Sequence, residues 1–230
     1  MTGSGLPSAS VEAGADTDAP AAFPWPPAAG SSALGAFCRT WWESVFRPAE
    51  FFRRMPGTTG TGAAVGYYFA VGMLLAVVEL FWQLTFTLAV GAVFTYFTRL
   101  REALGLAVDA VSPILSFLFA PAVLTLLLTF VFAVVHATLW LAGGARGGAA
   151  TTLRVLCYAY GARGFAVVPF IGGLVGSVWM VVVAIIGLRE AHRTDDWRAA
   201  LAVLGPVAAL FALGVAIALI VALLVGIGMA

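Results

Sequence analysis

The chain has 230 residues, of which 62% are apolar and 10% charged, with a formal net charge of +1 and a mean hydropathy of +1.01. A soluble domain carries about 45–50% apolar and about 25% charged residues, so an ordinary soluble globule and a disordered chain are excluded. The balanced charge also excludes a protein that binds nucleic acid, which leaves a polytopic membrane protein.

The residue types absent from the chain exclude several chemistries. All twelve basic residues are arginines, so a lysine P-loop and a lysine Schiff base are excluded. The two cysteines, Cys38 and Cys157, are far apart and form no CxxC pair, and the two histidines form no HExxH motif. We therefore expect no enzyme, no cofactor and no metal site.

The N-terminal part precedes the first span. Residues 1–33 are rich in Ala, Pro, Gly and Ser, which predicts a disordered tail. Residues 34–56 carry an apolar stripe at helical spacing, and Pro48 divides them into two short helices. These helices could lie in the membrane interface, or they could pack on the spanning helices of the protein itself. The sequence leaves both alternatives open.

Residues 57–230 form the predicted membrane domain. A membrane-spanning helix needs about 20 apolar residues, and the apolar run from 152 to 188 is too long for one span. Pro169, followed by Gly172 and Gly173, divides that run. We therefore predict an all-α bundle with five transmembrane helices, at about 67–97, 114–141, 152–168, 170–188 and 197–225.

The arginines predict the orientation through the positive-inside rule. With five spans and the N-terminus inside, nine arginines lie inside and two, Arg99 and Arg101, lie outside; with four spans the ratio is six to five. Arg163, within the third span, is not counted. Five spans, with the N-terminus inside and the C-terminus outside, is the preferred topology. The nine inside residues are Arg39, Arg47, Arg53, Arg54, Arg146, Arg154, Arg189, Arg193 and Arg198.

Glu79 is the one acidic residue in the middle of a predicted span. A charge at that depth costs on the order of 3 kcal/mol, so such residues face protein or water and often mark function. Gln83 lies one turn away, and His136 in the second span could pair with Glu79 or relay a proton. The structural alternatives are a protonated Glu79 bonded to a neighbouring helix and a His136 that links two helices.

Arg163 must find a partner or reach an interface, and Tyr158 with Tyr160 could supply hydroxyl groups nearby. Gly172 and Gly176 form a GxxxG pair that permits close helix packing. His192, between charged residues, is expected to be a solvated loop residue. The candidate intramembrane polar site is therefore Glu79, Gln83, His136, Arg163 and Tyr158.

Two stretches carry a family resemblance. "FRPAEFFRRMP" (Phe46 to Pro56) and the block from Leu139 to Leu201, which contains "IIGLREAH", resemble the Yip family of Ypt/Rab-interacting membrane proteins, in its bacterial branch. The resemblance covers about residues 45–225. One departure is "YAYGARG", where the family pattern would place a proline soon after the tyrosine. The family implies five membrane helices with a cytoplasmic N-terminus. The acidic motif linked with Rab binding is not recognisable in residues 1–33, so that activity is not transferred.

The first functional hypothesis is a non-enzymatic membrane protein that organises membrane partners or lipids through its cytoplasmic face. Expected partners are the lipid bilayer, another membrane protein and a second copy of the chain, in a bacterial cytoplasmic membrane. The hypothesis requires partly exposed Trp41 and Phe51. The alternative is a small transporter or channel subunit with a polar path near Glu79 and His136. The candidate cytoplasmic interaction face is Trp41, Phe51, Arg53, Arg54, Arg189 and Arg193.

Overall fold

The computed structural model describes residues 23–57, 60–95 and 111–228, and within these ranges the regular elements are all helices. The two arginines predicted to lie outside, Arg99 and Arg101, and residues 1–22 of the predicted tail are not among the described residues. The elements are α1 (Ala33–Phe46), α2 (Pro48–Arg53), α3 (Thr61–Thr95), α5 (Val111–Leu141), α6 (Gly148–Ala159), the 3₁₀ helix η1 (Tyr160–Val167), α7 (Ile171–His192) and α8 (Asp196–Gly228).

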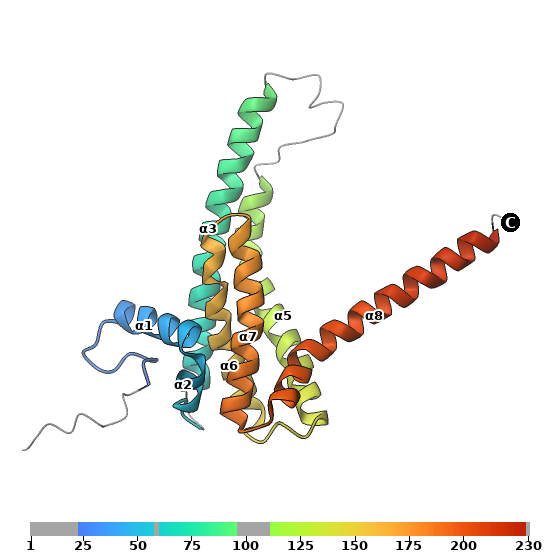
Figure 1. Cartoon of the computed structure of the whole chain (residues 1–230). Helices are drawn as coiled ribbons and strands as arrows, with labels where there is room; N and C mark the ends of the chain where they lie inside the picture. Colours follow the sequence, from blue (N-terminus) through green and yellow to red (C-terminus); the bar gives the residue numbers. More distant parts are fainter. Residues whose placement is uncertain (1–22, 58–59, 96–110, 229–230) are drawn as a thin grey trace, which may run out of the picture.

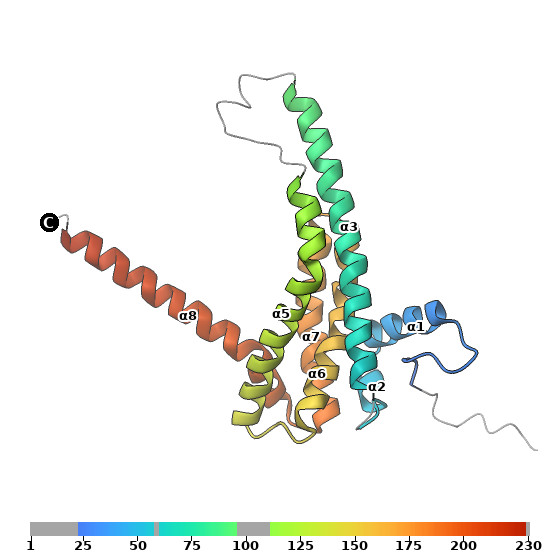
Figure 2. The same ribbon diagram turned by 180° about the vertical axis from the view of Figure 1, so that it is seen from behind.

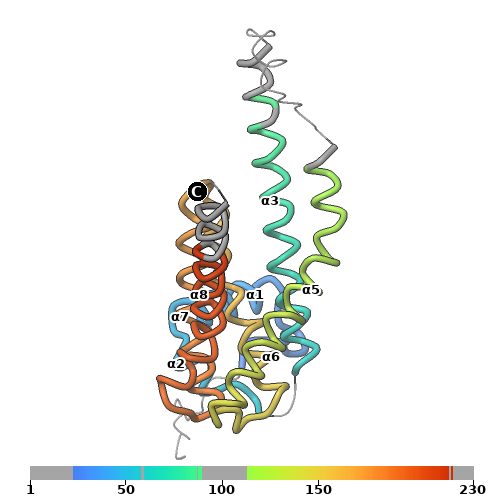
Figure 3. Tube along the Cα trace, turned by 90° about the vertical axis from the view of Figure 1, so that its right-hand side faces the viewer, coloured from blue at the N-terminus to red at the C-terminus, as the bar shows by residue number. Residues whose placement is uncertain are grey.

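Four upright segments, α3, α5, α6–η1 and α7, lie side by side, while α1 lies across them and α8 leaves at an angle (Figures 1 and 2). Turned by 90°, the molecule shows α3 and α5 on one side and α7 and α8 on the other (Figure 3). The start of α6 and of α8 and the end of α5 and of α7 all lie at the lower end of Figure 1, which we call the basic end. Its two connecting turns are residues 142–147 and 193–195.

In the described part of the chain, four helices are long and apolar enough to cross a membrane: Thr61–Phe86, Pro113–Leu141, Ile171–His192 and Asp196–Ile217. The predicted third span at 152–168 is not one α-helix, because α6 ends at Ala159 and η1 continues the chain. Gly161 and Gly164 lie where other side chains approach closely. A Cβ atom at Gly161 would lie 2.5 Å from the Tyr67 hydroxyl, and one at Gly164 would lie 2.6 Å from the Trp41 indole nitrogen. Glycines are poor α-helix formers, so the α-helix gives way to η1 where these glycines admit the two aromatic rings.

A tight turn joins η1 to α7. Pro169 disfavours helical backbone at the preceding residue, and Val168 is extended with φ −84° and ψ 119°. The two glycines of the GxxxG pair, Gly172 and Gly176, are buried against η1. A Cβ at Gly172 would lie 2.0 Å from the Phe165 carbonyl oxygen, and one at Gly176 would lie 2.9 Å from that of Ala162. The glycines therefore allow the backbones of η1 and α7 to touch.

The two N-terminal helices differ in how they are buried. Ser32 caps α1 through a hydrogen bond from the Gly35 N–H, and Pro48 begins α2. Phe51 and Phe52, on α2, are buried against the rest of the chain, so for α2 packing on the protein's own helices is the correct alternative. On α1, Val45 is buried while Trp42 is 54% exposed. Helix α1 is thus amphipathic, with one side free for lipid or solvent.

The predicted disordered tail, residues 1–33, includes residues that pack on the rest of the chain. Phe23 packs on Phe51 and Tyr158, with ring centroids 4.8 and 5.6 Å apart. The indole N–H of Trp25 donates a hydrogen bond of 2.7 Å to the Ala63 carbonyl. Aromatic residues among the prolines bury enough apolar surface to order this stretch, which composition alone had assigned to the tail.

Candidate functional site

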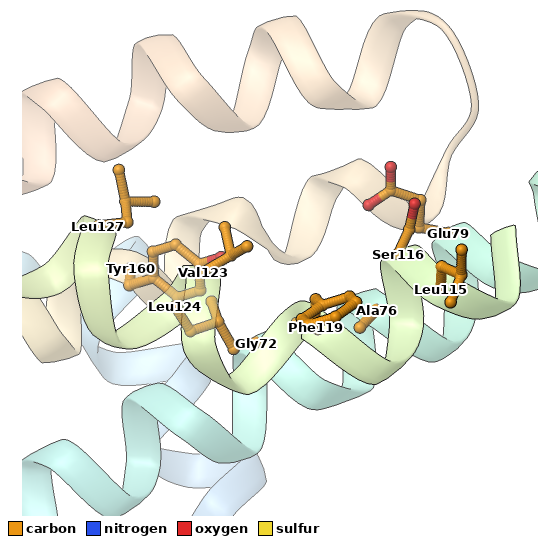
Figure 4. A pocket seen from close by; sticks show the side chains of 11 residues that line it. Gly72, Ala76, Glu79, Leu115, Ser116, Phe119, Val123, Leu124, Leu127 and Tyr160 are labelled. Atoms are coloured by element: carbon orange, nitrogen blue, oxygen red, sulfur yellow. The ribbon is translucent and has the colours of Figure 1, made fainter. Parts of the chain in front are cut away.

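A pocket of about 730 Å³ lies between α3, α5 and the start of η1 (Figure 4). Glu79 and Ser116 lie at one end, and Tyr160 lies toward the other (Figure 4). Between these polar groups the walls are apolar. The lining residues are Gly72, Ala76, Glu79, Leu115, Ser116, Phe119, Ala120, Val123, Leu124, Leu127 and Tyr160.

Glu79 has the expected neighbour one turn away. The Gln83 amide donates a hydrogen bond of 2.9 Å to a Glu79 carboxylate oxygen. The opposite wall, on α5, comes close because Gly72 has no side chain. A Cβ there would lie 2.5 Å from Leu124, whose carbonyl also accepts a hydrogen bond of 3.0 Å from the Tyr68 hydroxyl. The structure therefore places the carboxyl group of Glu79 in a mostly apolar pocket, with Ser116 and Tyr160 as the other polar side chains of its lining.

His136 does not line this pocket, so the predicted path joining it to Glu79 is wrong. Its Nδ1 lies 2.9 Å from the Thr152 hydroxyl, which lies 3.0 Å from His192 Nε2. His192 Nδ1 in turn accepts a hydrogen bond of 3.0 Å from the Gly147 N–H. His192 is therefore an Nε2–H tautomer and donates to Thr152, whose hydroxyl then donates to His136. His136 links α5 to α6, which is the structural alternative.

His192 itself was expected in a solvated loop, and that prediction is wrong. It is 1% exposed, because α7 continues through the charged sequence to His192 before Arg193 turns the chain with φ 49°. The i−4 spacing from the buried Leu188 was the signal available in the sequence. The charged residues on either side of His192 indicated a solvated loop instead.

Arg154, which the sequence marks only as one of the nine inside arginines, is a central residue of the packed structure. Its side chain is 1% exposed and donates hydrogen bonds to the carbonyls of Pro56, Gly57 and Ala150. A further bond of 3.1 Å goes to the Thr151 hydroxyl. Arg154 therefore ties the chain entering α3 to α6 at the basic end. A buried guanidinium needs several hydrogen-bond acceptors around it, because removing its charge from water is costly.

Arg163 and Tyr158 do not share a site. Arg163 donates to the Gly173 carbonyl at 3.3 Å and to the Ser177 hydroxyl, both on α7. Tyr158 lies in a buried aromatic cluster, with its ring 5.2 Å from Phe51 and 5.4 Å from Tyr67. The five predicted polar-site residues thus separate into the Glu79–Gln83 pair, the His136 link, the Arg163 anchor and the Tyr158 core position.

The predicted cytoplasmic face is also divided. Phe51 is 0% exposed, and the Trp41 indole N–H donates a hydrogen bond of 2.8 Å to the Gly161 carbonyl. Phe51 is therefore not the partly exposed residue that the first hypothesis required, whereas Trp41 packs on η1 and stays partly exposed. Sequence periodicity placed them on an apolar stripe but could not tell lipid from protein as its partner.

The arginines of that face are mostly paired. Arg53 and Arg189 both contact Glu190, at 3.2 and 2.7 Å. Arg54 contacts Glu43 at 2.6 Å. Arg193 remains exposed in the turn before α8, and Arg146, in the other turn, donates to the Arg193 carbonyl at 3.3 Å.

Aromatic residues surround this basic end. Trp140, near the end of α5, is 68% exposed, and Trp197, at the start of α8, is 58% exposed. The guanidinium of Arg198 lies 5.2 Å from the Trp197 ring centroid. Exposed tryptophans beside arginines are typical of a membrane–water interface. Among the described residues, no three His, Cys, Asp or Glu side chains gather where they could hold a metal ion.

The helical arrangement and the apolar spans can be compared with known families. The family model described as the Yip1 domain matches residues 42–228. The chain belongs to the Yip1 domain family. No curated protein and no solved structure matches it. The Yip1 domain thus begins within α1 and ends with α8, so it includes the pocket and the basic end. Members of this family are non-enzymatic, multi-pass membrane proteins.

Proposed function

We propose that this Yip1 domain protein organises lipids with anionic headgroups at the cytoplasmic face of a bacterial membrane. The observation that carries the proposal is the basic end, where exposed arginines and tryptophans from separate elements lie together. Arg146 and Arg193 come from the two turns, and Trp140 and Trp197 from the flanking helices. A basic residue near an anionic surface contributes about 1 kcal/mol to membrane binding, so a few such residues give a clear lipid preference.

The proposed orientation places the basic end in the cytoplasm, in agreement with the positive-inside rule. We count five membrane segments by treating α6–η1 as one of them. Twelve α-helical residues and eight 3₁₀ residues extend about 34 Å, which resembles the roughly 33 Å of α7. The N-terminus is then inside and the C-terminus outside. An alkaline phosphatase fused after Ala230 should be active, and one inserted at Arg146 should be inactive.

Lipid preference can be measured with the purified protein in nanodiscs that contain phosphatidylglycerol and phosphatidylcholine. Native mass spectrometry should find retained phosphatidylglycerol, and the double variant Arg146→Gln/Arg193→Gln should retain less of it. Arg53→Gln is the matched control, because Arg53 is paired with Glu190. Equal retention by the wild type and the double variant would refute the lipid proposal.

A partner protein is the competing occupant of the basic end. Photocrosslinking from Trp140 and Trp197, which are exposed at the basic end, separates the two cases. Crosslinks to phospholipid support the proposal. A discrete crosslinked protein, or a dimer of this chain, would favour a protein partner instead.

The pocket favours a second candidate function, a small transporter or channel subunit. Only Glu79 and its neighbour Gln83 still support it, because His136 lies elsewhere. If Glu79 carries protons or cations, proteoliposomes should show a flux that Glu79→Gln abolishes. Gln83→Glu would be expected to alter that flux and to leave the fold intact.

A further inference from the structure

The turn between η1 and α7 has an unusual surface for a loop. Residues 164–176 contain no charged or hydrogen-bonding side chain. Val168, Phe170 and Ile171 are nevertheless 60%, 84% and 69% exposed. Loops that face water are normally rich in polar turn residues. We call residues 167–171 the hairpin tip.

The backbone of the hairpin tip is largely satisfied from within the protein. The N–H groups of Val168, Ile171 and Gly172 donate to the carbonyls of Phe165, Pro169 and Val168, at 3.1, 2.8 and 3.1 Å. Pro169 has no N–H to satisfy. The Val167 carbonyl accepts a hydrogen bond of 3.2 Å from the indole of Trp82, on α3. In hydrocarbon an unsatisfied backbone group costs several kcal/mol, so this arrangement is what a turn surrounded by lipid requires.

The length of α3 places the hairpin tip well short of the far membrane surface. Trp82 marks the level of the tip, and α3 continues for thirteen more residues to Thr95. At 1.5 Å per residue this continuation is about 20 Å long. Figure 1 shows α3 rising well above the turn between η1 and α7. The continuation has the sequence QLTFTLAVGAVFT and is mostly apolar, so it belongs in the membrane and not in water.

Arg163, within η1, is compatible with this depth. Its guanidinium is held against α7 by the Gly173 carbonyl and the Ser177 hydroxyl. Charged groups at membrane depth are tolerated when they face protein and bond to carbonyl groups.

We propose that the hairpin tip contacts lipid acyl chains inside the bilayer and does not reach the far headgroups. Segments α6–η1 and α7 then enter and leave on the same side and do not reach the far surface. Because the hairpin begins and ends on the same side of the membrane, α8 begins on the side where α5 ends. The proposed orientation of α3, α5 and α8 is therefore unchanged. The side on which they enter rests on the orientation proposed above, but the depth of the tip does not.

The depth is measured with nitroxide spin labels on the full chain in vesicles of phosphatidylcholine and phosphatidylglycerol. The background is Cys38→Ser; Cys157 stays, because it is fully buried. Single cysteines are placed by Val168→Cys at the tip and, as a control in water, by Arg146→Cys. A second control is Trp42→Cys, on the exposed side of α1. The background protein without an added cysteine reports labelling of Cys157.

Collision rates are then compared for oxygen, which concentrates in hydrocarbon, and for a nickel complex, which stays in water. We expect the Val168→Cys label to collide with oxygen most and with nickel several-fold less than the Arg146→Cys label does. Equal nickel collision rates at the two positions would overturn the proposal, because the tip would then lie in water. This readout does not depend on which side is cytoplasmic. Failure of the proposed orientation would instead appear when Arg146→Cys is labelled from outside intact cells by an impermeant maleimide.

Discussion

Trp41 and Gly161 are joined by a hydrogen bond of 2.8 Å from the indole N–H to the backbone carbonyl, across 120 residues of sequence. The bond attaches α1 to the point where α6 becomes η1. It depends on two glycines, because Gly161 and Gly164 leave the space that the Trp41 ring and the Tyr67 hydroxyl occupy. The N-terminal helix is therefore part of the bundle and not an appendage to it.

The first prediction concerns this bond. Trp41→Phe keeps an aromatic ring but leaves the Gly161 carbonyl without its donor, so stability should fall by about 1–3 kcal/mol. The neighbouring change Trp42→Phe is the matched control, since Trp42 is 54% exposed. Its effect should stay within about 0.5 kcal/mol. Thermal unfolding of the detergent-solubilised protein checks both, and equal midpoints for the two variants would contradict the prediction.

The second prediction compares two adjacent glycines in α7. Gly172→Ala places a methyl group 2.0 Å from the Phe165 carbonyl oxygen, so η1 and α7 must separate. Overpacking of this kind costs about 1–3 kcal/mol. Gly173→Ala meets no atom within 4 Å, and alanine is the better helix former, by up to about 1 kcal/mol. The two variants should therefore shift the unfolding midpoint in opposite directions. A shift of the same sign and size would show that the predicted backbone contact is absent.

The sequence predicts the parts of this fold that depend on local pattern. Four of the five predicted spans coincide with helices in the described residues that are long and apolar enough to cross a membrane. Pro169 with Gly172 and Gly173 locates the hairpin turn. These features follow from hydropathy, and from backbone restrictions that act within a few residues. Nothing in the same pattern separates α6 from η1, because the change depends on rings contributed by α1 and α3.

The candidate site was predictable only in part. Glu79 and Gln83 were found because an acid inside a span is conspicuous and its partner is one turn away. Ser116 and Tyr160 complete the pocket from other helices, and a single sequence does not give the register between helices. The same reason explains His136. The sequence left open whether His136 pairs with Glu79 or links two helices, and its partner in the structure is Thr152 on α6.

The third prediction concerns Arg154. Arg154→Met removes the donors for the carbonyls of Pro56, Gly57 and Ala150. Each carbonyl left buried and unsatisfied costs about 1–3 kcal/mol, so we expect a large loss of stability and poor recovery of folded protein. Arg146→Met is the control, because Arg146 is exposed in a turn. Arg154→Lys retains the charge with fewer donors and should give an intermediate midpoint. A Lys variant as unstable as the Met variant would indicate that the bonds, and not the charge, dominate.

The fourth prediction is a pH dependence at Glu43. Its carboxylate accepts hydrogen bonds from Arg39 at 2.7 Å and from Arg54 at 2.6 Å. Burial acts to raise the pKa of Glu43, but these bonds and the two positive charges outweigh burial and hold the pKa below its ordinary value of 4.5. A lowered pKa means that the unfolded chain binds the proton more readily than the folded chain. The stabilisation is therefore complete above the unfolded pKa and is lost as the pH falls through the folded pKa.

The measurement is the unfolding midpoint of the solubilised protein between about pH 6 and pH 3, where carboxylates of this kind titrate. Glu43→Gln should lower the midpoint at the upper end of that range and should flatten its decline toward acid. Glu50→Gln, on the exposed side of α2, should follow the wild-type profile. Parallel profiles for the wild type and Glu43→Gln would show that the link from Arg39 through Glu43 to Arg54 does not stabilise α1 against α2. The link would then be one of the many surface ion pairs that contribute little, because solvent screens their charges.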